Sequence, residues 1–195
     1  YDVREGSITI DGVNIKNISQ HCLRSQMGVV LQETFLFSGT LYDNISYAKP
    51  DASREEIIQS AKLAGAHKFI MKLPDGYQTY VGERGYTLSG GERQRIVIAR
   101  AILSNLSILF FGEARSALGT ETVQMVLNSI ASLTKNRTTF AIAHRLSTLR
   151  NATKLIVIDK GKIAEFGTHE ELMKLNGIYA SLVLAQRTMS RMGNK

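Results

Sequence analysis

Three short apolar segments, separated by stretches with helical periodicity, constrain the fold of this chain most strongly. The segments are residues 27–32, 108–111 and 138–143. The run at 108–111 is continuously apolar, as expected of a strand that is covered on both faces. Between the segments, apolar residues recur at helical spacing, first after Ser53 and again after Ser89. Helices between buried strands predict an α/β fold with a mostly parallel sheet.

Two antiparallel hairpins are predicted beside this sheet. Residues 6–13 alternate apolar and polar side chains and turn at Asp11-Gly12. Residues 154–166 contain two apolar runs that are joined by a turn at Asp159-Lys160-Gly161. These hairpins are expected to flank the parallel core.

Helix starts can be placed from capping residues. A Ser or Thr followed three residues later by Glu forms a capping box, and this pattern begins helices at Ser53 and Thr168. A further helix is predicted to start near Ser89. The part of the chain from about residue 40 to 105 is the more helical and indicates an inserted lobe. The basic tail, residues 186–195, is expected to be frayed.

The composition narrows the class of protein. A chain of 195 residues with 44% hydrophobic and 21% charged residues is typical of a soluble globular domain. Cys22 is the single cysteine, which excludes an internal disulfide and favours a reducing compartment. No apolar run approaches the roughly 18–20 residues of a membrane helix. The net charge of +7 is compatible with a solvated basic surface or with an anionic partner.

The most specific chemical feature is the string Leu-Ser-Gly-Gly-Glu-Arg-Gln-Arg at residues 88–95. A serine and two glycines at a helix start form a potential anion cradle. Glycine lets the backbone approach a phosphate, and the first N–H groups and the helix dipole favour negative charge. For an arbitrary Ser-Gly-Gly, simple helix capping by Ser89 would be the better interpretation. His21, His67 and His169 show no partner spacing and are interpreted as surface residues.

The complete string is similar to the signature motif of the ATP-binding domains of ABC transporters. Further segments resemble motifs of the exporter-type subgroup in the order of that family, so the resemblance covers essentially the whole chain. It implies an α/β fold with a partial RecA-like, mostly parallel sheet core, flanking antiparallel hairpins and an inserted helical lobe. The implied parts are a β-subdomain remnant with the Q-loop (1–39), a helical signature lobe (40–105), and a catalytic core remnant with a C-terminal helix (106–195).

The resemblance also implies roles for individual residues. Gln32 matches the Q-loop glutamine near magnesium and the attacking water, Glu113 follows a buried strand and would polarise that water, and His144 matches the switch histidine that reaches the γ-phosphate. The signature residues would bind the nucleotide of a partner domain: Leu88, Ser89, Gly90, Gly91 and Glu92. A segment resembling the exporter X-loop would contact the transmembrane domain: Thr79, Val81, Gly82, Glu83, Arg84 and Gly85.

Two departures from the family pattern limit these expectations. The chain contains no G-x-x-x-x-G-K-[ST] string, so we expect it to begin after the phosphate-binding loop of a longer domain. The aspartate that would help to hold magnesium is replaced by Gly112, a D-loop aspartate by Gly119, and a threonine by Arg115. Because a metal ion contributes several kcal/mol of charge stabilisation, the loss of a ligand should weaken turnover.

Three functional hypotheses follow. The leading one is an ATP-binding and ATP-hydrolysing domain of an ABC exporter, with ATP and Mg²⁺ as cofactors, at the cytoplasmic face of a cell membrane. Its expected partners are a second ABC ATPase domain in a head-to-tail dimer and the transmembrane domain of the same transporter. The alternative is a non-catalytic ABC-type module that binds nucleotide or a partner domain and regulates without turnover. A third, a soluble ABC protein that acts on DNA or ribosomes, is disfavoured by the exporter-like segments, and no nucleic acid partner is expected.

Overall fold

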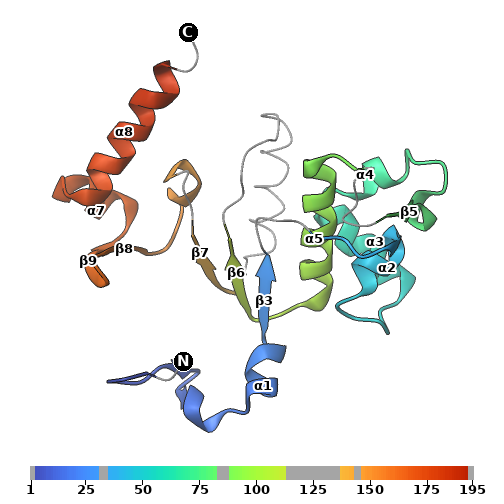
Figure 1. Cartoon of the computed structure of the whole chain (residues 1–195), viewed down its shortest axis with the longest axis horizontal. Coiled ribbons are helices and arrows are strands. Elements are labelled where there is room, and N and C mark those ends of the chain that lie inside the picture. Colours follow the sequence, from blue (N-terminus) through green and yellow to red (C-terminus); the bar gives the residue numbers. More distant parts are fainter. Residues whose placement is uncertain (1–2, 31–34, 83–87, 113–136, 143–145, 193–195) are drawn as a thin grey trace. The chain divides into compact units, whose positions relative to one another are not determined.

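Figure 1 shows a computed structural model of the chain, which describes residues 3–30, 35–82, 88–112, 137–142 and 146–192. The chain divides into two compact units, Tyr1–Ile142 and Ala143–Lys195. Each unit has its own hydrophobic core, and each is described by itself below.

A three-stranded parallel sheet lies in the first unit (Figure 1). Its strands are β3 (Met27–Val30), β6 (Ile108–Phe111) and β7 (Thr138–Ala141), in the order β3-β6-β7. Val30 pairs with Phe111, and Phe111 pairs with Ala141, so all three strands end in one row. The parallel α/β core that the apolar runs predict is therefore confirmed.

Helix α5 (Gly90–Ser104) connects this sheet to a helical lobe. It packs against β3 and against two helices of the lobe, α2 (Leu41–Ser46) and α3 (Arg54–Leu63). The remaining elements of the lobe are β4 (Gly39–Thr40), α4 (His67–Ile70), the 3₁₀ helix η2 (Gly76–Gln78) and β5 (Tyr80–Val81). The lobe shares one hydrophobic core with the sheet, whose fully buried members include Leu41, Ile45, Ile57, Ile96, Ile98 and Leu109.

The first unit begins with the predicted hairpin. Strands β1 (Thr9–Ile10) and β2 (Val13–Asn14) pair antiparallel. The turn residues Asp11 and Gly12 both have positive φ, +48° and +80°, as a tight two-residue hairpin turn requires. A 3₁₀ helix, η1 (Ile15–Asn17), and helix α1 (Gln20–Ser25) lead to β3.

The second unit contains a hairpin and two helices. Strands β8 (Leu155–Asp159) and β9 (Lys162–Gly167) pair antiparallel, as predicted. A 3₁₀ helix, η4 (Leu146–Leu149), precedes them, and α7 (His169–Leu175) and α8 (Ile178–Met192) follow. The core of this unit consists of Leu155, Leu172, Tyr179 and Val183.

Two expectations from the sequence are wrong. The basic tail is not frayed from Gln186 onward, because α8 continues to Met192 and packs against α7 and η4. Two histidines also have partners: His67 Nδ1 lies 2.9 Å from the Tyr77 hydroxyl, and His169 Nδ1 lies 2.8 Å from that of Tyr179. In each pair the tyrosine is ten residues further along the chain and is buried, so tertiary packing places it beside the histidine. Apolar residues at helical spacing also predict a helix at 120–133, and this segment lies outside the described residues.

Candidate functional site

The signature string forms the predicted start of α5. Ser89 is the N-cap, and its hydroxyl accepts a hydrogen bond from the Glu92 N–H at 3.3 Å. The Glu92 carboxylate in turn accepts from the Ser89 N–H at 2.8 Å and from the Ser89 hydroxyl at 2.7 Å. This reciprocal arrangement is a capping box, and it fixes the direction in which the chain enters the helix.

The same helix end offers donors to an anion. The first N–H groups of a helix have no partner within the helix, and α5 is 15 residues long, so its dipole adds positive potential at this end. Ser89 and Gly90 are exposed, whereas Leu88 is buried and anchors the turn. Arg93 Nη1 donates a hydrogen bond to the Leu88 carbonyl, and this bond stabilises the turn that precedes α5. An anionic group can therefore approach Ser89 and Gly90, although the Glu92 carboxylate already bonds to Ser89.

A second candidate region lies at the common edge of the parallel sheet. The Gly112 N–H donates to the Val30 carbonyl at 2.9 Å, and the Ile142 N–H donates to the Phe111 carbonyl at 3.1 Å, which extends the row of strand ends by one residue. Ligand sites of open α/β sheets form outside the carboxyl ends of parallel strands. The predicted residues Gln32, Glu113 and His144 follow these strands by two or three positions in the sequence, and all three lie outside the described residues.

The described part of the edge lacks metal ligands. Gly112 occupies the first position after β6, where it contributes a backbone N–H and no carboxylate. Among the described residues, no cluster of His, Cys, Asp or Glu side chains is arranged to hold a metal ion. The expected residues Gln32 and Glu113 lie outside the described residues, whereas the start of α5 offers N–H donors that suit a phosphate group.

The predicted coupling segment is partly described. Val81 is fully buried, and its strand β5 pairs with β4. The Thr79 carbonyl accepts from the Leu41 N–H at 3.0 Å, and the buried Thr79 hydroxyl has no hydrogen-bond partner among the described residues. Gly82 has room around it, with no atom within 4 Å of an added Cβ. Glu83, Arg84 and Gly85 lie outside the described residues.

An arginine-centred aromatic cluster, which the sequence analysis missed, lies in the same lobe. The Arg100 guanidinium on α5 donates to the backbone carbonyl of Asn44 at 2.8 Å and to its side-chain oxygen at 3.0 Å. It also lies over the rings of Phe37 and Tyr47, which stack at 4.2 Å. Burial lowers the pKa of Arg100. Phe35 packs edge-on against Phe37, with the ring centroids 5.1 Å apart. Tyr47 and Phe35 expose 61% and 51% of their surfaces, so the cluster presents aromatic area to solvent. In the sequence, the signal for this cluster is Arg100 itself, a charged residue among the apolar positions of α5.

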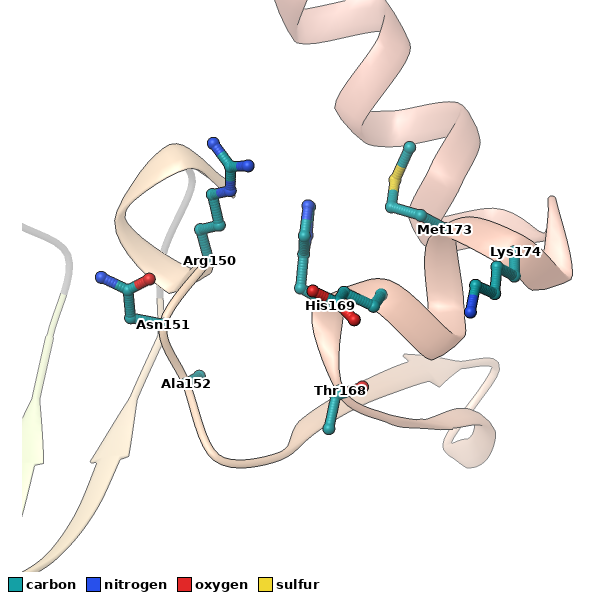
Figure 2. A pocket seen from close by; sticks show the side chains of 8 residues that line it. Arg150, Asn151, Ala152, Thr168, His169, Met173 and Lys174 are labelled. Carbon is teal, nitrogen blue, oxygen red and sulfur yellow. The ribbon is translucent and has the colours of Figure 1, made fainter.

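The second unit contains an open pocket of about 610 Å³ beside the start of α7. Figure 2 shows Arg150 and Asn151 on the segment after η4, and His169, Met173 and Lys174 on α7. Glu170 also lines the pocket, so its wall contains both cationic and anionic side chains. None of the residues predicted to act on nucleotide lines this pocket.

An α/β fold whose parallel strands end in one row, together with a glycine-rich helix start, defines the structural class of this chain. Comparison with known proteins identifies its family. A family model described as ABC transporter matches residues 1–116. The chain belongs to this family.

The relatives are named as ABC transporters or exporters. An ABC transporter B family member 4 of Dictyostelium discoideum is 51% identical over 98% of this chain and 25% of its own length. A putative multidrug export ATP-binding/permease protein of Bacillus subtilis, YgaD, is 50% identical over 95% of the chain and 32% of its own length. A solved structure of a bacterial Atm1-family ABC exporter with ATP bound superposes on this chain with a TM-score of 0.87 and is 45% identical in sequence. The match covers 95% of this chain and 32% of the exporter chain.

The chain thus spans only about a quarter to a third of the length of these relatives. In the part of the chain that the structure describes, no helix has the length and apolar character that crossing a bilayer requires.

Proposed function

We propose that this chain is part of the ATP-binding domain of an ABC exporter, and that it supplies one half of a composite ATP site. The observation that carries the proposal is the exposed start of α5, where Ser89 and Gly90 can meet a phosphate group. In a head-to-tail dimer this helix end would bind a nucleotide that is held by a second ABC domain. The family membership and the likeness to an ATP-bound exporter support this assignment.

The residues that follow the row of strand ends would act on a nucleotide held within the same domain. Phosphoryl transfer requires charge neutralisation and an in-line water more than covalent chemistry. Glu113 would orient and polarise that water, Gln32 would contact it, and His144 would donate a hydrogen bond to a phosphate oxygen. The absence of a G-x-x-x-x-G-K-[ST] string leaves the chain without the lysine and the backbone loop that cradle phosphates in this class.

Gly112 stands where the family pattern has an aspartate, and it offers no side-chain ligand to magnesium. We therefore propose that turnover by this copy of the domain is impaired.

The proposed partners are a second ABC ATPase domain and a transmembrane domain, which would hold this domain at the cytoplasmic face of the cell membrane. The exposed rings of Phe35 and Tyr47 offer apolar area for such a partner. The division of the chain into three parts, 1–39, 40–105 and 106–195, belongs to the same proposal.

The second candidate function is a non-catalytic ABC-type module that binds nucleotide or a partner domain and regulates without turnover. Gly112 and Gly119 favour it, because each stands where the family pattern has an aspartate. Such a module would retain the anion-accepting start of α5 and would not need a metal site.

One experiment separates the two functions. Steady-state ATP hydrolysis is measured for the full-length transporter that contains this chain, with Gly112 and with the Gly112→Asp variant. A turnover that rises sharply in the variant supports an impaired ATPase and contradicts the regulatory module. Nucleotide binding without turnover in either protein supports the module.

A further inference from the structure

Helix α8 supplies a hydrogen-bond acceptor to the segment that follows His144. The side-chain oxygen of Gln186 accepts a hydrogen bond from the Leu146 N–H at 3.0 Å, across 40 residues of sequence. Leu146 is the first residue of η4, and the first N–H groups of a helix have no acceptor within it. Gln186 therefore caps η4 from a distant part of the chain.

The helix that carries Gln186 is firmly attached at its start. The buried Glu165 carboxylate on β9 accepts hydrogen bonds from the Ile178 and Tyr179 N–H groups, the first two of α8. The Tyr179 hydroxyl is paired with His169 at 2.8 Å. A charged acceptor at two helix N–H groups is among the stronger hydrogen-bonding arrangements. These contacts limit sliding and rotation of α8 relative to β9 and α7.

Apolar packing continues along the same face of α8. Tyr179, Val183 and Gln186 are spaced by four and three residues, so they lie on one side of the helix. Tyr179 and Val183 are buried in the core of the unit, against which Leu146 and Leu149 of η4 also pack. The hydrogen bond from Leu146 is thus the last contact in a continuous series from β9 through α8 to η4.

We propose that Gln186 is a positioning residue for the switch histidine. His144 lies two residues before Leu146 in the sequence, so a Leu146 N–H held by Gln186 would restrict the backbone at His144. The inference rests on the proposed role of His144 toward a phosphate group, and it adds that the C-terminal helix sets the geometry of that role. A displacement of α8 would disturb the segment that begins at Leu146, through this hydrogen bond and through the apolar contacts of Leu146 and Leu149.

The first test measures amide hydrogen exchange in the 195-residue chain without nucleotide. Gln186→Met keeps the length of the side chain and removes the acceptor, whereas Gln186→Glu keeps an acceptor oxygen. Arg187→Ala, an exposed neighbour on the same helix, is the control. Exchange of the Leu146 amide should accelerate about 3- to 10-fold in Gln186→Met, as for the loss of one ordinary hydrogen bond, and should return close to the wild-type rate in Gln186→Glu. Equal rates in Gln186→Met and the control would overturn the inference.

The second test measures ATP turnover by the full-length transporter. Gln186→Met should lower kcat roughly tenfold with little change in KM, since a misplaced group acts on the transition state more than on binding. In the His144→Ala background the same substitution should have no further effect. An equal loss in both backgrounds would show a general structural role and would contradict positioning. If no variant turns over ATP, the proposed function fails, and the exchange experiment still decides whether Gln186 orders the segment.

Discussion

Arg100 illustrates how one residue can organise the helical lobe. Its guanidinium extends from α5 and compensates for burial with hydrogen bonds to Asn44 and stacking on Phe37 and Tyr47. Asn44 is buried and uses the same side chain to pair with both backbone groups of Phe37 at 2.9 Å. The exposed aromatic area of the lobe therefore depends on the planar guanidinium of Arg100 and its several hydrogen bonds.

Arg100→Lys should destabilise the first unit by about 1.5–3 kcal/mol, because an ammonium group cannot reproduce the planar fork. The free energy of unfolding is measured by urea denaturation at neutral pH. Arg54→Lys, at the exposed start of α3, is the matched control and should change it by less than about 0.5 kcal/mol. Similar small changes in both variants would show that the charge alone matters at Arg100.

Gly177 has a comparable importance in the second unit. A Cβ at this position would lie 2.0 Å from Oε1 of Glu165 and 2.9 Å from its Cδ. Gly177→Ala would therefore push the carboxylate away from the start of α8, at a cost of about 1–3 kcal/mol in the free energy of unfolding. In the Glu165→Ala background the added methyl group meets no carboxylate, so the same substitution should cost clearly less. Thermal unfolding of the four proteins gives this double-mutant cycle, and additive effects would show that the two residues do not interact.

Reciprocal capping boxes define the starts of several helices in the described part of the chain. They begin α2, α3, α5 and α7, with a Ser or Thr at the N-cap and an Asp or Glu three residues later. Hydrogen bonds from Thr40, from its side chain first and its backbone second, lower the pKa of Asp43. Backbone and side-chain hydrogen bonds from Thr168 likewise lower the pKa of Glu171. These carboxylates are held in their charged form by the fold.

The direction of the resulting pH dependence follows from these shifts. A carboxyl group whose pKa is lower in the folded state stabilises the fold at a pH above its unfolded pKa, roughly 4, and this contribution is lost as the pH falls through the folded value. The urea midpoint should therefore decrease between about pH 5 and pH 3. Asp43→Asn and Thr40→Ala should each flatten this decrease, since one removes the titrating group and the other its donor. A slope unchanged in both variants would contradict the assignment.

The elements were easier to predict than the contacts between them. Capping residues and apolar periodicity are local signals, and they located the starts of α3, α5 and α7 and the three strands of the parallel sheet. The Gln186–Leu146 hydrogen bond joins residues 40 positions apart, and the His169–Tyr179 pair depends on how α7 and α8 pack, so neither has a local signature. The start of α5 was recognised because its string is long and specific, whereas the cluster around Arg100 brings together residues from separate segments.

At the scale of the whole molecule, the two units differ in what they can offer to a nucleotide. The first contains the start of α5 and the row of strand ends, and the second contains η4 with its support from α8. Neither contains a glycine-rich loop with a lysine to cradle the β- and γ-phosphates, since the whole sequence lacks that string. A composite site would need this loop from elsewhere.

The chain alone is therefore expected to show no detectable Mg-ATP binding up to millimolar nucleotide in a calorimetric titration. A helix start contributes only part of the charge neutralisation that a triphosphate requires, and each exposed interaction with a helix dipole is worth about 0.3–1 kcal/mol. Addition of a second ABC domain that has a phosphate-binding loop should restore ATP-dependent association, which sedimentation can detect. Gly90→Asp should abolish that association, because it places a carboxylate where a phosphate would approach. Micromolar binding by the chain alone would contradict the composite site and would locate the nucleotide determinants elsewhere in the fold.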